Sequence, residues 1–596
     1  MTTPHPLRLA LWIGLLTGIA EITLQAIERF LLHRLIFLGN DFGWMAPLAD
    51  VAVFLLAGSI LWAGQRLWPG RVTATVMLGL LTTMGAWAVL LMYPPLHRGA
   101  ALLLAAGVGY QCARLLPLAT PGFGRLLRYS TATMLGVVVL CALVPRLMSS
   151  RRAHTTLAAM PPARAGAPNV LLIILDTVRA MSLSLYGYPR ATTPQLERWA
   201  SRGVVFDMAL SPAPWTLPAH ASMFTGRWPH ELGVDWRRAL DRTYPTLAEQ
   251  LTAAGYVTAG FVANTTYCSE ETGLNRGFQH WEAYPVSFQM VVKSASLGRA
   301  LTGAEWFREL FGWYQPLARR HGDEISASLL RWVGSGKAAP WFATLNYLDA
   351  HAPYLPPAPF RDRFGPIEPR GNPTLVPGYA WLPEEIRREQ NAYDASIAAL
   401  DDELGHLFDS LEARGELRNT LVIVTADHGE EFYEHQLMDH GNSLYLPAIH
   451  VPLLMWLPGT VPAGRRVTAP VTTRDLPATI LAIAVPQEPA ALPGRSLVPL
   501  WSDAGTAVAP DTLLAEVNYT SGLPDRYPVS KGPMRSVLLD GLRLIENGDR
   551  TTELYDFITD KAERNNLAEI DTATVARLAR ILEQLTAPTA AGPAPR

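Results

Sequence analysis

The chain has 596 residues, a formal net charge of −2 and only 17% charged residues. This near-neutral balance gives no reason to expect a nucleic-acid partner. A hydrophobic fraction of 49% and a positive mean hydropathy are high for a soluble protein, and they predict that part of the chain lies in lipid. Of the three cysteines, Cys112 and Cys141 fall in apolar stretches and Cys268 stands alone, which excludes a disulfide framework and a cysteine–zinc cluster in the soluble part.

The N-terminal quarter contains long, apolar and almost uncharged stretches, each close to the roughly 20 residues that a helix needs to cross the hydrocarbon core. They run over 7–27, 45–66, 72–92, 99–118 and 130–148. The first lacks a small-residue cleavage site, so we do not interpret it as a removed signal peptide. We expect residues 1–148 to form a transmembrane region of about five helices. Glu21 would be either a carboxyl facing the bundle interior or an intramembrane functional group.

The arginines between these stretches predict the orientation of the region, because cytoplasmic loops carry an excess of basic residues. With the N-terminus inside, the cytoplasmic segments hold Arg8, Arg66, Arg71, Arg114, Arg125 and Arg128, and the outer loops hold Arg29, Arg34 and Arg98. An odd number of spans then places everything after about residue 150 outside. We therefore expect a multi-pass integral membrane protein with an extracytoplasmic soluble domain, which is periplasmic if the cell is Gram-negative.

Composition divides the rest of the chain. Residues 149–168 are rich in Ala, Pro and Arg, and we interpret them as a semi-extended linker. Residues 587–596 show no apolar period and are predicted to be disordered. Residues 169–586 would form the soluble domain.

Within 169–586, short aliphatic runs alternate with amphipathic helical patterns, which indicates a mostly parallel sheet covered by helices. The predicted strands are 169–175, 257–263, 341–348, 420–426 and 451–457. Helical periods occupy 193–203 and 393–415, and Gly415 suits a helix C-terminus. The run from "GLRLIENGD" to "ELYDFITD" predicts a small β-rich appendage near the C-terminus.

Polar side chains follow four of the predicted strands at the point where each strand ends. They are Asp176, Asn264, Asp349 with His351, and Asp427 with His428. Any one of these aspartates has a simpler explanation, since aspartates cap helices and open turns. Because ligands of an open α/β sheet gather at the carboxyl ends of its strands, the joint pattern with histidines predicts one polar site at that edge.

A second element of the site is "SPAPWTLPAHASMFTG", in which Thr216 precedes a helix-compatible run. Pro218 suits the first turn of that helix. One interpretation is that Thr216 simply caps the helix. The other is a nucleophile at a helix N-terminus, where free N–H groups and the dipole favour an anion. A threonine hydroxyl is a poor nucleophile, so it then needs a metal or a base.

These stretches resemble the sulfatase family of the alkaline phosphatase superfamily. The resemblance starts with "DTVR", "LYGYPRATTPQLERWASRGVVF", "SPAPWTLPAHASMFTG" and "HELGV". It continues with "NYLDAHAPYLPP", "TADHGEEFYEH", "DHGNSLY", "HVPLLMWLPG" and "ELYDFITDKAERNNL", and covers nearly all of 168–570. It implies an α/β, alkaline-phosphatase-like fold with a mostly parallel sheet sandwiched by helices.

The resemblance also implies roles for individual residues. Asp176, Asp427 and His428 would hold one divalent metal ion together with Thr216, the nucleophile. Manganese or zinc is favoured, and magnesium or calcium is compatible with such ligands. His351 and His440 would clamp the transferred group and protonate the leaving group. His220 would either contact the anion or pack beside Thr216. Further contacts to the anion or the metal shell are expected from Arg179, Asn264, Asn442 and Lys531, whereas His97, His406 and His450 are expected to carry no chemistry.

Two departures from the family pattern bear on the reaction. Sulfatases usually carry Cys-x-Pro-x-Arg, or Ser for Cys, and oxidise the cysteine to formylglycine; Thr216 and His220 take the Cys and Arg places here, and a threonine cannot form that aldehyde. Thr177 replaces the second of two leading aspartates. A site with one leading carboxylate and a threonine looks more like phosphoethanolamine transferases and lipoteichoic acid synthases, which share a five-span anchor.

We therefore expect a membrane-anchored, metal-dependent enzyme that cleaves or transfers a phosphoryl group through a Thr216 adduct. Its substrate would be a phospholipid head group or an envelope glycan. One alternative is a sulfuric ester hydrolase that works without formylglycine. Another is a catalytically inactive binding protein of the envelope.

Overall fold

The computed structural model describes residues 4–68, 70–336, 339–368, 379–486, 492–502 and 511–587, with only the backbone at 152–154 and 158. Except for Ala587, the predicted disordered tail lies outside these residues. The chain divides into two compact units. The first contains the chain up to Thr155 together with Tyr284–Ala318, and the second contains Thr156–Ala283 and the chain from Arg319. Residues Tyr284–Ala318, which the sequence places inside the soluble domain, thus group with the N-terminal helices.

Each of the five apolar N-terminal stretches folds as a helix. The helices are α1 Pro6–Ala26, α2 Phe42–Leu67, α3 Ala74–Leu90, α4 Arg98–Leu115 and α5 Pro121–Ala159. Among the described residues, three stretches are long and apolar enough to cross a membrane, namely Pro6–Leu31, Phe42–Leu67 and Pro121–Leu157, while Ala74–Leu90 is apolar but shorter. A multi-helix membrane anchor is consistent with this, and five spans remain a prediction.

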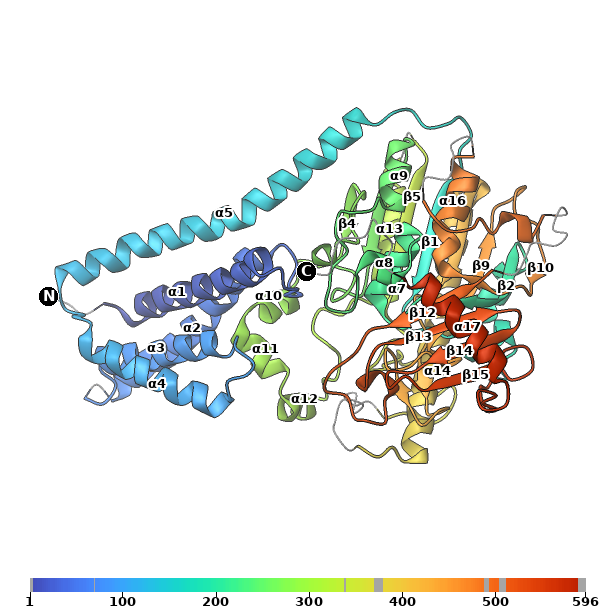
Figure 1. The fold of residues 1–596 in the computed structure, drawn as a ribbon. Helices are drawn as coiled ribbons and strands as arrows, with labels where there is room; N and C mark the ends of the chain where they lie inside the picture. The colour runs from blue at the N-terminus through green and yellow to red at the C-terminus, as the bar shows by residue number, and fades with distance from the viewer. Residues whose placement is uncertain are drawn as a thin grey trace. The chain divides into compact units, whose positions relative to one another are not determined.

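Two features of the first unit differ from the expectation. Helix α5 continues through 149–159, where the composition predicted an extended linker. The reason is that no proline interrupts the chain between Pro145 and Pro161, and the alanines and arginines there favour a helix. The unit also contains α10 Phe288–Ser294, α11 Ser296–Thr302 and α12 Glu305–Phe311, which Figure 1 draws beside α1 to α4.

The second unit is built on a nine-stranded sheet with the order β10-β2-β9-β6-β1-β5-β3-β4, and β11 also pairs with β2. Its strands are β1 Asn169–Leu175, β2 Val204–Leu210, β3 Val257–Val262, β4 His280–Glu282, β5 Trp341–Tyr347, β6 Thr420–Thr425, β9 His450–Trp456, β10 Arg465–Val467 and β11 Val471–Thr472. The five predicted strands are all present, and β2 is an additional long one. All strand pairs are parallel except those of β9, which is antiparallel to β2 and β6, so the sheet is mixed.

The aliphatic runs form strands because both of their sides are buried under helices. Residues 170–175 of β1 are all buried, as are all residues of β5, β6 and β9. Helices α7 Thr216–Thr225, α9 Leu247–Ala253 and α16 Leu476–Ala484 pack with one another or against β1 and β3. Helix α14 Pro383–Ala413 packs with α6 Pro194–Ala200 and α13 Gly322–Val333. Helix α14 ends before Gly415, whose φ of 75° only a glycine adopts easily.

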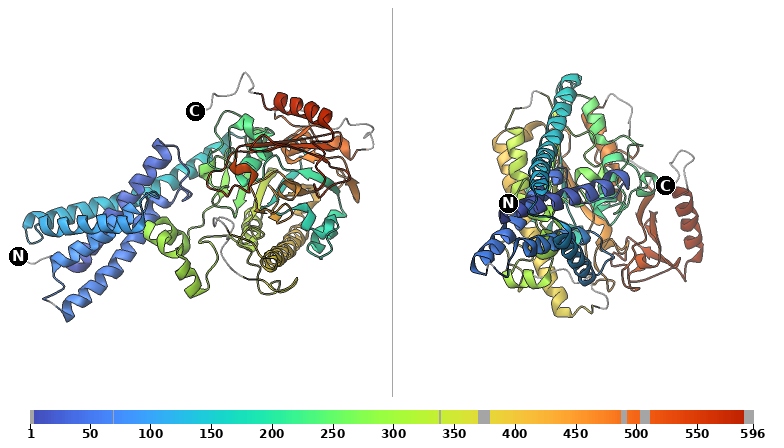
Figure 2. Two further views of the ribbon diagram at one scale, coloured as in Figure 1. Left: turned by 60° about the horizontal axis from the view of Figure 1, so that its bottom comes forward. Right: turned by 90° about the vertical axis from the view of Figure 1, so that its left-hand side faces the viewer.

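A second, four-stranded antiparallel sheet follows in the chain. It comprises β12 Leu513–Val517, β13 Met534–Leu539, β14 Leu542–Glu546 and β15 Thr552–Asp556. Helix α17 Thr572–Leu585 lies along it, as Figure 2 shows in red. Leu578 and Leu582 of α17 bury themselves against Val537, Leu544 and Leu554 of the sheet. This amphipathic packing explains why a short sheet with few strands is stable.

Candidate active site

The polar residues that follow the strands of the main sheet lie at one edge. Strands β3, β5, β1 and β6 are consecutive parallel neighbours, so their carboxyl ends point the same way. Asn264 donates a hydrogen bond from Nδ2 to Asp176 Oδ2 at 2.8 Å, although the two residues are 88 positions apart in the chain. Asp349 was predicted to join the same site, but its Oδ1 accepts a hydrogen bond from the backbone N–H of Gly322 at 3.0 Å.

Three side chains at this edge form a candidate metal centre. One ligand atom from each of Asp176, Asp427 and His428 lies within 4.8 Å of the other two, and all three side chains are buried. His428 Nε2 is 3.9 Å from Asp176 Oδ1 and 3.6 Å from Asp427 Oδ2. The other ring nitrogen, Nδ1, is 3.0 Å from the Gly429 carbonyl. When Nδ1 donates there, the lone pair of Nε2 faces the carboxylates, as a metal ligand requires.

The donor set fits a divalent cation. Asp176 Oδ1 and Asp427 Oδ2 are buried and have no hydrogen-bond partner among the residues that the structure describes. Burial, and then the negative charge of Asp176, raise the pKa of Asp427 well above its ordinary value. Two buried carboxylates this close are costly without a compensating positive charge. A divalent ion between Asp176, Asp427 and His428 supplies that charge, and mixed oxygen and nitrogen ligands suit several such ions.

Thr216 is the first residue of α7, and its hydroxyl faces the metal centre. The Oγ1 atom is 3.3 Å from His428 Nε2 and accepts a hydrogen bond from Asn264 Nδ2 at 3.4 Å. The side chain is buried. Trp215 holds the N-cap position and no side-chain capping bond forms, so the interpretation of Thr216 as a simple helix cap is wrong. Its hydroxyl is instead held between the amide of Asn264 and the ring of His428, at the positive end of a helix.

His220 lies one helical turn after Thr216 on the same side of α7. Its Nδ1 is 2.8 Å from the Thr216 carbonyl and 3.6 Å from Asp427 Oδ2. The Nε2 atom is buried without a partner. Burial lowers the pKa of His220, so a neutral ring is favoured. These contacts fit a residue that packs beside Thr216.

His440 is held by two carboxylates. Its Nδ1 is 3.1 Å from Glu430 Oε1 and 2.9 Å from Asp439 Oδ1. Burial lowers the pKa of His440, but the charges of Glu430 and Asp439 outweigh it and hold the pKa well above its ordinary value. The ring lies 4.4 Å from that of His428 and 5.1 Å from that of His351, between centroids. The structure thus brings both predicted catalytic histidines to the candidate metal centre.

Three further predicted contacts are engaged elsewhere. Arg179 is buried and donates from NH1 to Glu434 Oε1 at 2.6 Å and to the Glu430 carbonyl. Asn442 donates from Nδ2 to the Met438 carbonyl at 2.7 Å. Lys531 pairs with Asp549 at the surface. None of these hydrogen bonds reaches Thr216 or the three candidate ligands, so a role in binding the anion remains a prediction for all three.

The structure gives contacts at the site to three residues to which the sequence assigned no role there. Thr177 has a left-handed φ of 63°, and its backbone N–H donates to Asp427 Oδ1 at 3.3 Å. Asn346 on β5 donates from Nδ2 to Asp176 Oδ2 at 3.3 Å. Glu430 lies between His440 and the hydroxyl of Tyr354, which donates to it at 2.9 Å. Thr177 and Glu430 lie in motifs of the family resemblance, and Asn346 left a signal as an amide inside a buried strand.

The short ladder between β7 Glu431–Phe432 and β8 Met438–Asp439 explains how Glu430 meets His440. In this antiparallel pair, Glu431 faces Asp439, so the residues just outside the pair lie side by side.

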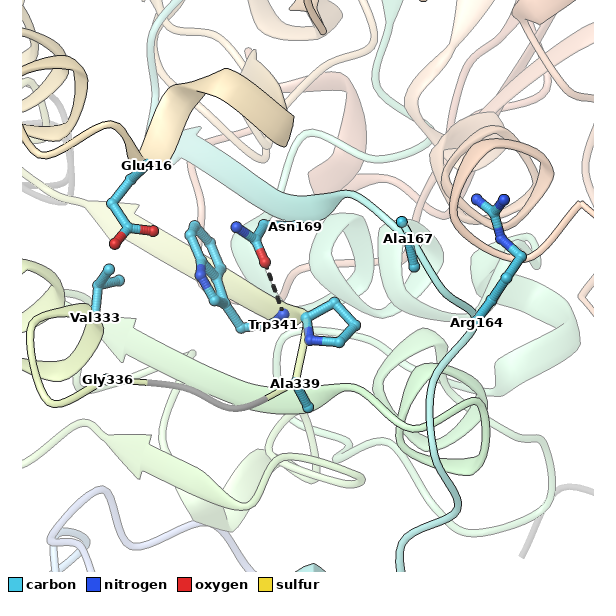
Figure 3. Close-up of a pocket in the computed structure, with 10 residues that line it drawn as sticks. Arg164, Ala167, Asn169, Val333, Gly336, Ala339, Trp341 and Glu416 are labelled. Atoms are coloured by element: carbon cyan, nitrogen blue, oxygen red, sulfur yellow. Dashed lines mark hydrogen bonds between the residues drawn. The ribbon is translucent and has the colours of Figure 1, made fainter.

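A cavity of about 410 Å³ lies elsewhere, near the amino ends of β1 and β5. Asn169 and Trp341, which begin these strands, line it together with Arg164 and Glu416 (Figure 3). Asn169 Oδ1 accepts the backbone N–H of Trp341 at 3.1 Å, which closes this end of the strand pair. Because Asp176 follows the other end of β1, this cavity is separate from the candidate active site.

Comparison with known families decides the identity. The family model described as Sulfatase matches residues 168–485, which is more than half of the chain. The chain belongs to the sulfatase family. A second model, described as N-sulphoglucosamine sulphohydrolase, C-terminal, matches residues 433–588 of this sulfatase-family chain. Members of the family typically bind a divalent metal ion, in agreement with the cluster of Asp176, Asp427 and His428.

Individual relatives agree with the family. The ulvan-active sulfatase of Formosa agariphila is 24% identical over 415 residues, covering 67% of this chain and 77% of the relative. The choline-sulfatase of Rhizobium meliloti is 25% identical over 469 residues, covering 69% and 85%. The phosphonate monoester hydrolase of Agrobacterium radiobacter superposes with a TM-score of 0.55 at 21% identity, over 72% of this chain and 99% of that structure. A protein solved with its substrate D-glucosamine-2-N,6-O-disulfate gives 0.56 at 18%, over 70% and 98%. These two structures share the fold.

Proposed function

We propose that this enzyme is a metal-dependent hydrolase of sulfuric esters in which the Thr216 hydroxyl attacks the sulfur atom. The observation that carries the proposal is the position of Thr216 Oγ1 beside His428 Nε2, next to two unpartnered carboxylate oxygens. The names of the relatives support sulfate over the phosphoryl group that the threonine led us to expect, since ulvan-active sulfatase and choline-sulfatase are both sulfatases.

Cleavage of a phosphoryl ester is the second candidate. It is favoured by Thr216 itself, because a threonine offers no route through a hydrated aldehyde and a covalent threonine ester must be opened by water or another acceptor. The phosphonate monoester hydrolase that shares the fold acts on a phosphorus ester by its name. Sulfate and phosphate esters have the same tetrahedral shape and differ mainly in charge, so one site chemistry serves both.

In the proposed mechanism, Asp176, Asp427 and His428 would hold the metal ion. The ion would neutralise charge on the ester and lower the pKa of the attacking hydroxyl. The hydrogen bond that Asn264 Nδ2 donates to Thr216 Oγ1 uses one lone pair of the hydroxyl oxygen. The other lone pair is then available for the attack. Attack forms a bond from Oγ1 to the sulfur while the bond from sulfur to the ester oxygen breaks, and the hydroxyl proton of Thr216 passes to a water molecule. The N–H groups at the start of α7 stabilise the negative charge that develops.

His440 would supply the proton that the departing ester oxygen needs. An imidazolium ring donates from both nitrogens, and Glu430 with Asp439 occupies Nδ1. The Nε2 proton then passes to the leaving oxygen, so that an alcohol departs. Water must next cleave the Thr216 ester and return the hydroxyl.

A matched substrate series tests the choice between the two esters. The purified full-length enzyme is offered the same aryl alcohol as sulfate, phosphate and phenylphosphonate ester, with added manganese or zinc. We expect kcat/KM for the sulfate ester to exceed that for both phosphorus esters by at least about tenfold, the discrimination that a site built for one charge state gives. Faster phosphate or phosphonate release would establish the second candidate.

Replacing His440 by glutamine tests its assignment as the acid. We expect kcat to fall by about 100-fold or more for an alkyl ester with a basic leaving group, the usual contribution of a general acid. The loss should be much smaller for a nitrophenyl ester, whose leaving group needs no proton. His450→Gln is the control, because His450 is a buried histidine whose Nε2 lies 3.1 Å from the Asp207 carbonyl, away from the site. Equal losses for both esters would show that His440 does not act as the acid.

We further propose that the helices of the first unit anchor the enzyme in a membrane, with the second unit outside the cytoplasm. The apolar helices α1, α2 and α5 support the anchor, and the arginine distribution supports the orientation. A sulfated glycan or a sulfated head group of the envelope would be the substrate. Metal content of the purified protein tests the remaining alternative of an inactive binding protein, which predicts a folded domain that holds no divalent ion.

A further inference from the structure

Residues Tyr284–Ala318 follow β4 of the main sheet and precede α13, yet they belong to the first unit together with the N-terminal helices. We call this first unit the helical unit. Helix α10 contacts α2, and α11 contacts α3. Met290 and Ala318 are buried together with Met45 in one apolar cluster, to which Trp44 and Tyr284 add their rings. The segment is therefore a packed part of the helical unit.

The contacts of this segment fall at one end of the helical unit. Ser296 begins α11, and its backbone N–H donates to Glu21 Oε2 at 3.0 Å. Its hydroxyl lies 2.7 Å from the Ala88 carbonyl. Glu21 is near the C-terminal end of α1, Met45 is in the first turn of α2, and Ala88 is in the last turn of α3. In successive antiparallel helices these three points belong to the same end.

Helix α5 reaches the same end. Cys141 packs with Ile22 and Phe42, and Arg146 pairs with Asp41 at 3.3 Å. Since α5 leads into the second unit, the chain leaves the helical unit at the end where Tyr284–Ala318 returns to it. If α1, α2 and α5 cross a membrane, this end marks one of its two surfaces.

At this end the segment exposes large apolar side chains. Helix α12 has no buried residue, and Trp306, Leu310 and Phe311 on it are 59%, 69% and 64% exposed. Phe288 at the start of α10 is 82% exposed. A seven-residue helix without a buried residue gains little from packing and is marginal in water. Its aromatic and leucine side chains stand beside Glu305, Arg308 and Glu309, and aromatic residues of this kind are typical of the boundary between head groups and acyl chains.

We propose that Tyr284–Ala318 is a membrane-surface element, with α12 embedded in the head-group layer of the leaflet at which α1 ends and α2 begins. Its partner is the lipid surface, because its exposed apolar side chains belong to the same unit as exposed apolar residues of helices expected to span that bilayer, such as Leu56 and Leu140. This inference rests on the proposed membrane anchor. It also deepens the proposed function. The second unit, which holds the candidate active site and is called the catalytic unit below, is joined to the first unit at three points of the chain. Esters presented at that leaflet then become its substrates.

The test uses the full-length chain in vesicles of phosphatidylcholine and phosphatidylglycerol. Cys112, Cys141 and Cys268 are replaced, and an environment-sensitive dye is attached to Leu310→Cys or, as the matched control, to Ile570→Cys. Ile570 is 81% exposed on the catalytic unit. Lipids brominated near the top of the acyl chain should quench the dye at position 310 at least about twofold, and lipids brominated near the chain end should quench it less, as for an interfacial helix. The dye at position 570 should keep its emission with both lipids.

Each other outcome overturns the proposal. A dye at position 310 that behaves like the dye at 570 would show that α12 is in water. Loss of lipid quenching with crosslinking between chains would show that a second copy covers α12. Trp306→Cys provides a second labelling position if Leu310→Cys does not fold. Carbonate extraction of membranes reports the anchor separately, and release of sulfate reports the proposed reaction, so that failure of either is distinguished from failure of this inference.

Discussion

Replacing Thr216 by alanine is expected to abolish ester hydrolysis, with a loss of at least about 1000-fold in kcat, because no other hydroxyl takes the place of the nucleophile. The fold should survive. The side chain does not cap α7, and the hydrogen bond that is lost, from Asn264 Nδ2, contributes about 1 kcal/mol. Turnover of a chromogenic sulfate ester and thermal unfolding of the same sample measure the two effects.

Thr225→Ala is the matched control for this variant. Thr225 is a buried threonine of the same helix, and its hydroxyl donates to the Ala221 carbonyl at 2.8 Å, so it loses a comparable bond without touching the site. We expect near-normal turnover for Thr225→Ala. Substantial activity in Thr216→Ala, above that of a metal-free sample, would exclude Thr216 as the nucleophile.

Asp427→Asn is expected to remove most of the bound metal while leaving the fold intact. The amide oxygen of asparagine can still accept the N–H groups of Thr177 and His428, as Oδ1 of Asp427 does. The second position, Oδ2, becomes an NH₂ group, which repels a cation in place of attracting it. We expect the affinity for manganese or zinc to fall by more than about tenfold, and turnover to fall with it. Metal per chain is measured by elemental analysis after dialysis against a defined free concentration.

Asp401→Asn separates this effect from a general loss of buried charge. Asp401 is a buried aspartate of α14 whose two oxygens accept the N–H groups of Gln195 and Leu196, each at 2.8 Å. We expect the Asp401→Asn variant to unfold at a lower temperature than the natural chain and to bind the same amount of metal per chain. Full metal occupancy in Asp427→Asn would refute the assignment of Asp427 as a ligand.

Three features of the fold differ from the architecture that the sequence predicted, namely the direction of β9, the packing of Tyr284–Ala318 and the length of α5. The direction of β9 depends on which neighbours its edges find, and a buried aliphatic run has the same composition in either direction. Residues Tyr284–Ala318 lie within the soluble part of the sequence, and nothing in their composition says that Met290 packs against Met45. The helical continuation of α5 to Ala159 was hidden by the prolines that follow it.

The sequence by itself determined five strands of the main sheet and predicted the residues of the candidate site. Long aliphatic runs must be buried on both sides, so they form the central strands, and the polar residues that end them must share one edge. Asp176, Asp427 and His428 follow from this rule together with the family resemblance. Thr216 follows from the prolines around it and the helical run behind it.

The tertiary structure alone decided which groups support these residues. Glu430 faces His440 only because a two-residue ladder folds the chain back, and Thr177 points its N–H at Asp427 only because its backbone takes a left-handed φ. Such contacts join residues that are far apart in the chain. Asn264 and Asp176 are 88 positions apart, and no sequence pattern reveals the hydrogen bond between them. Local patterns report burial and the type of element, whereas strand direction and pairing at a site depend on the packed sheet as a whole.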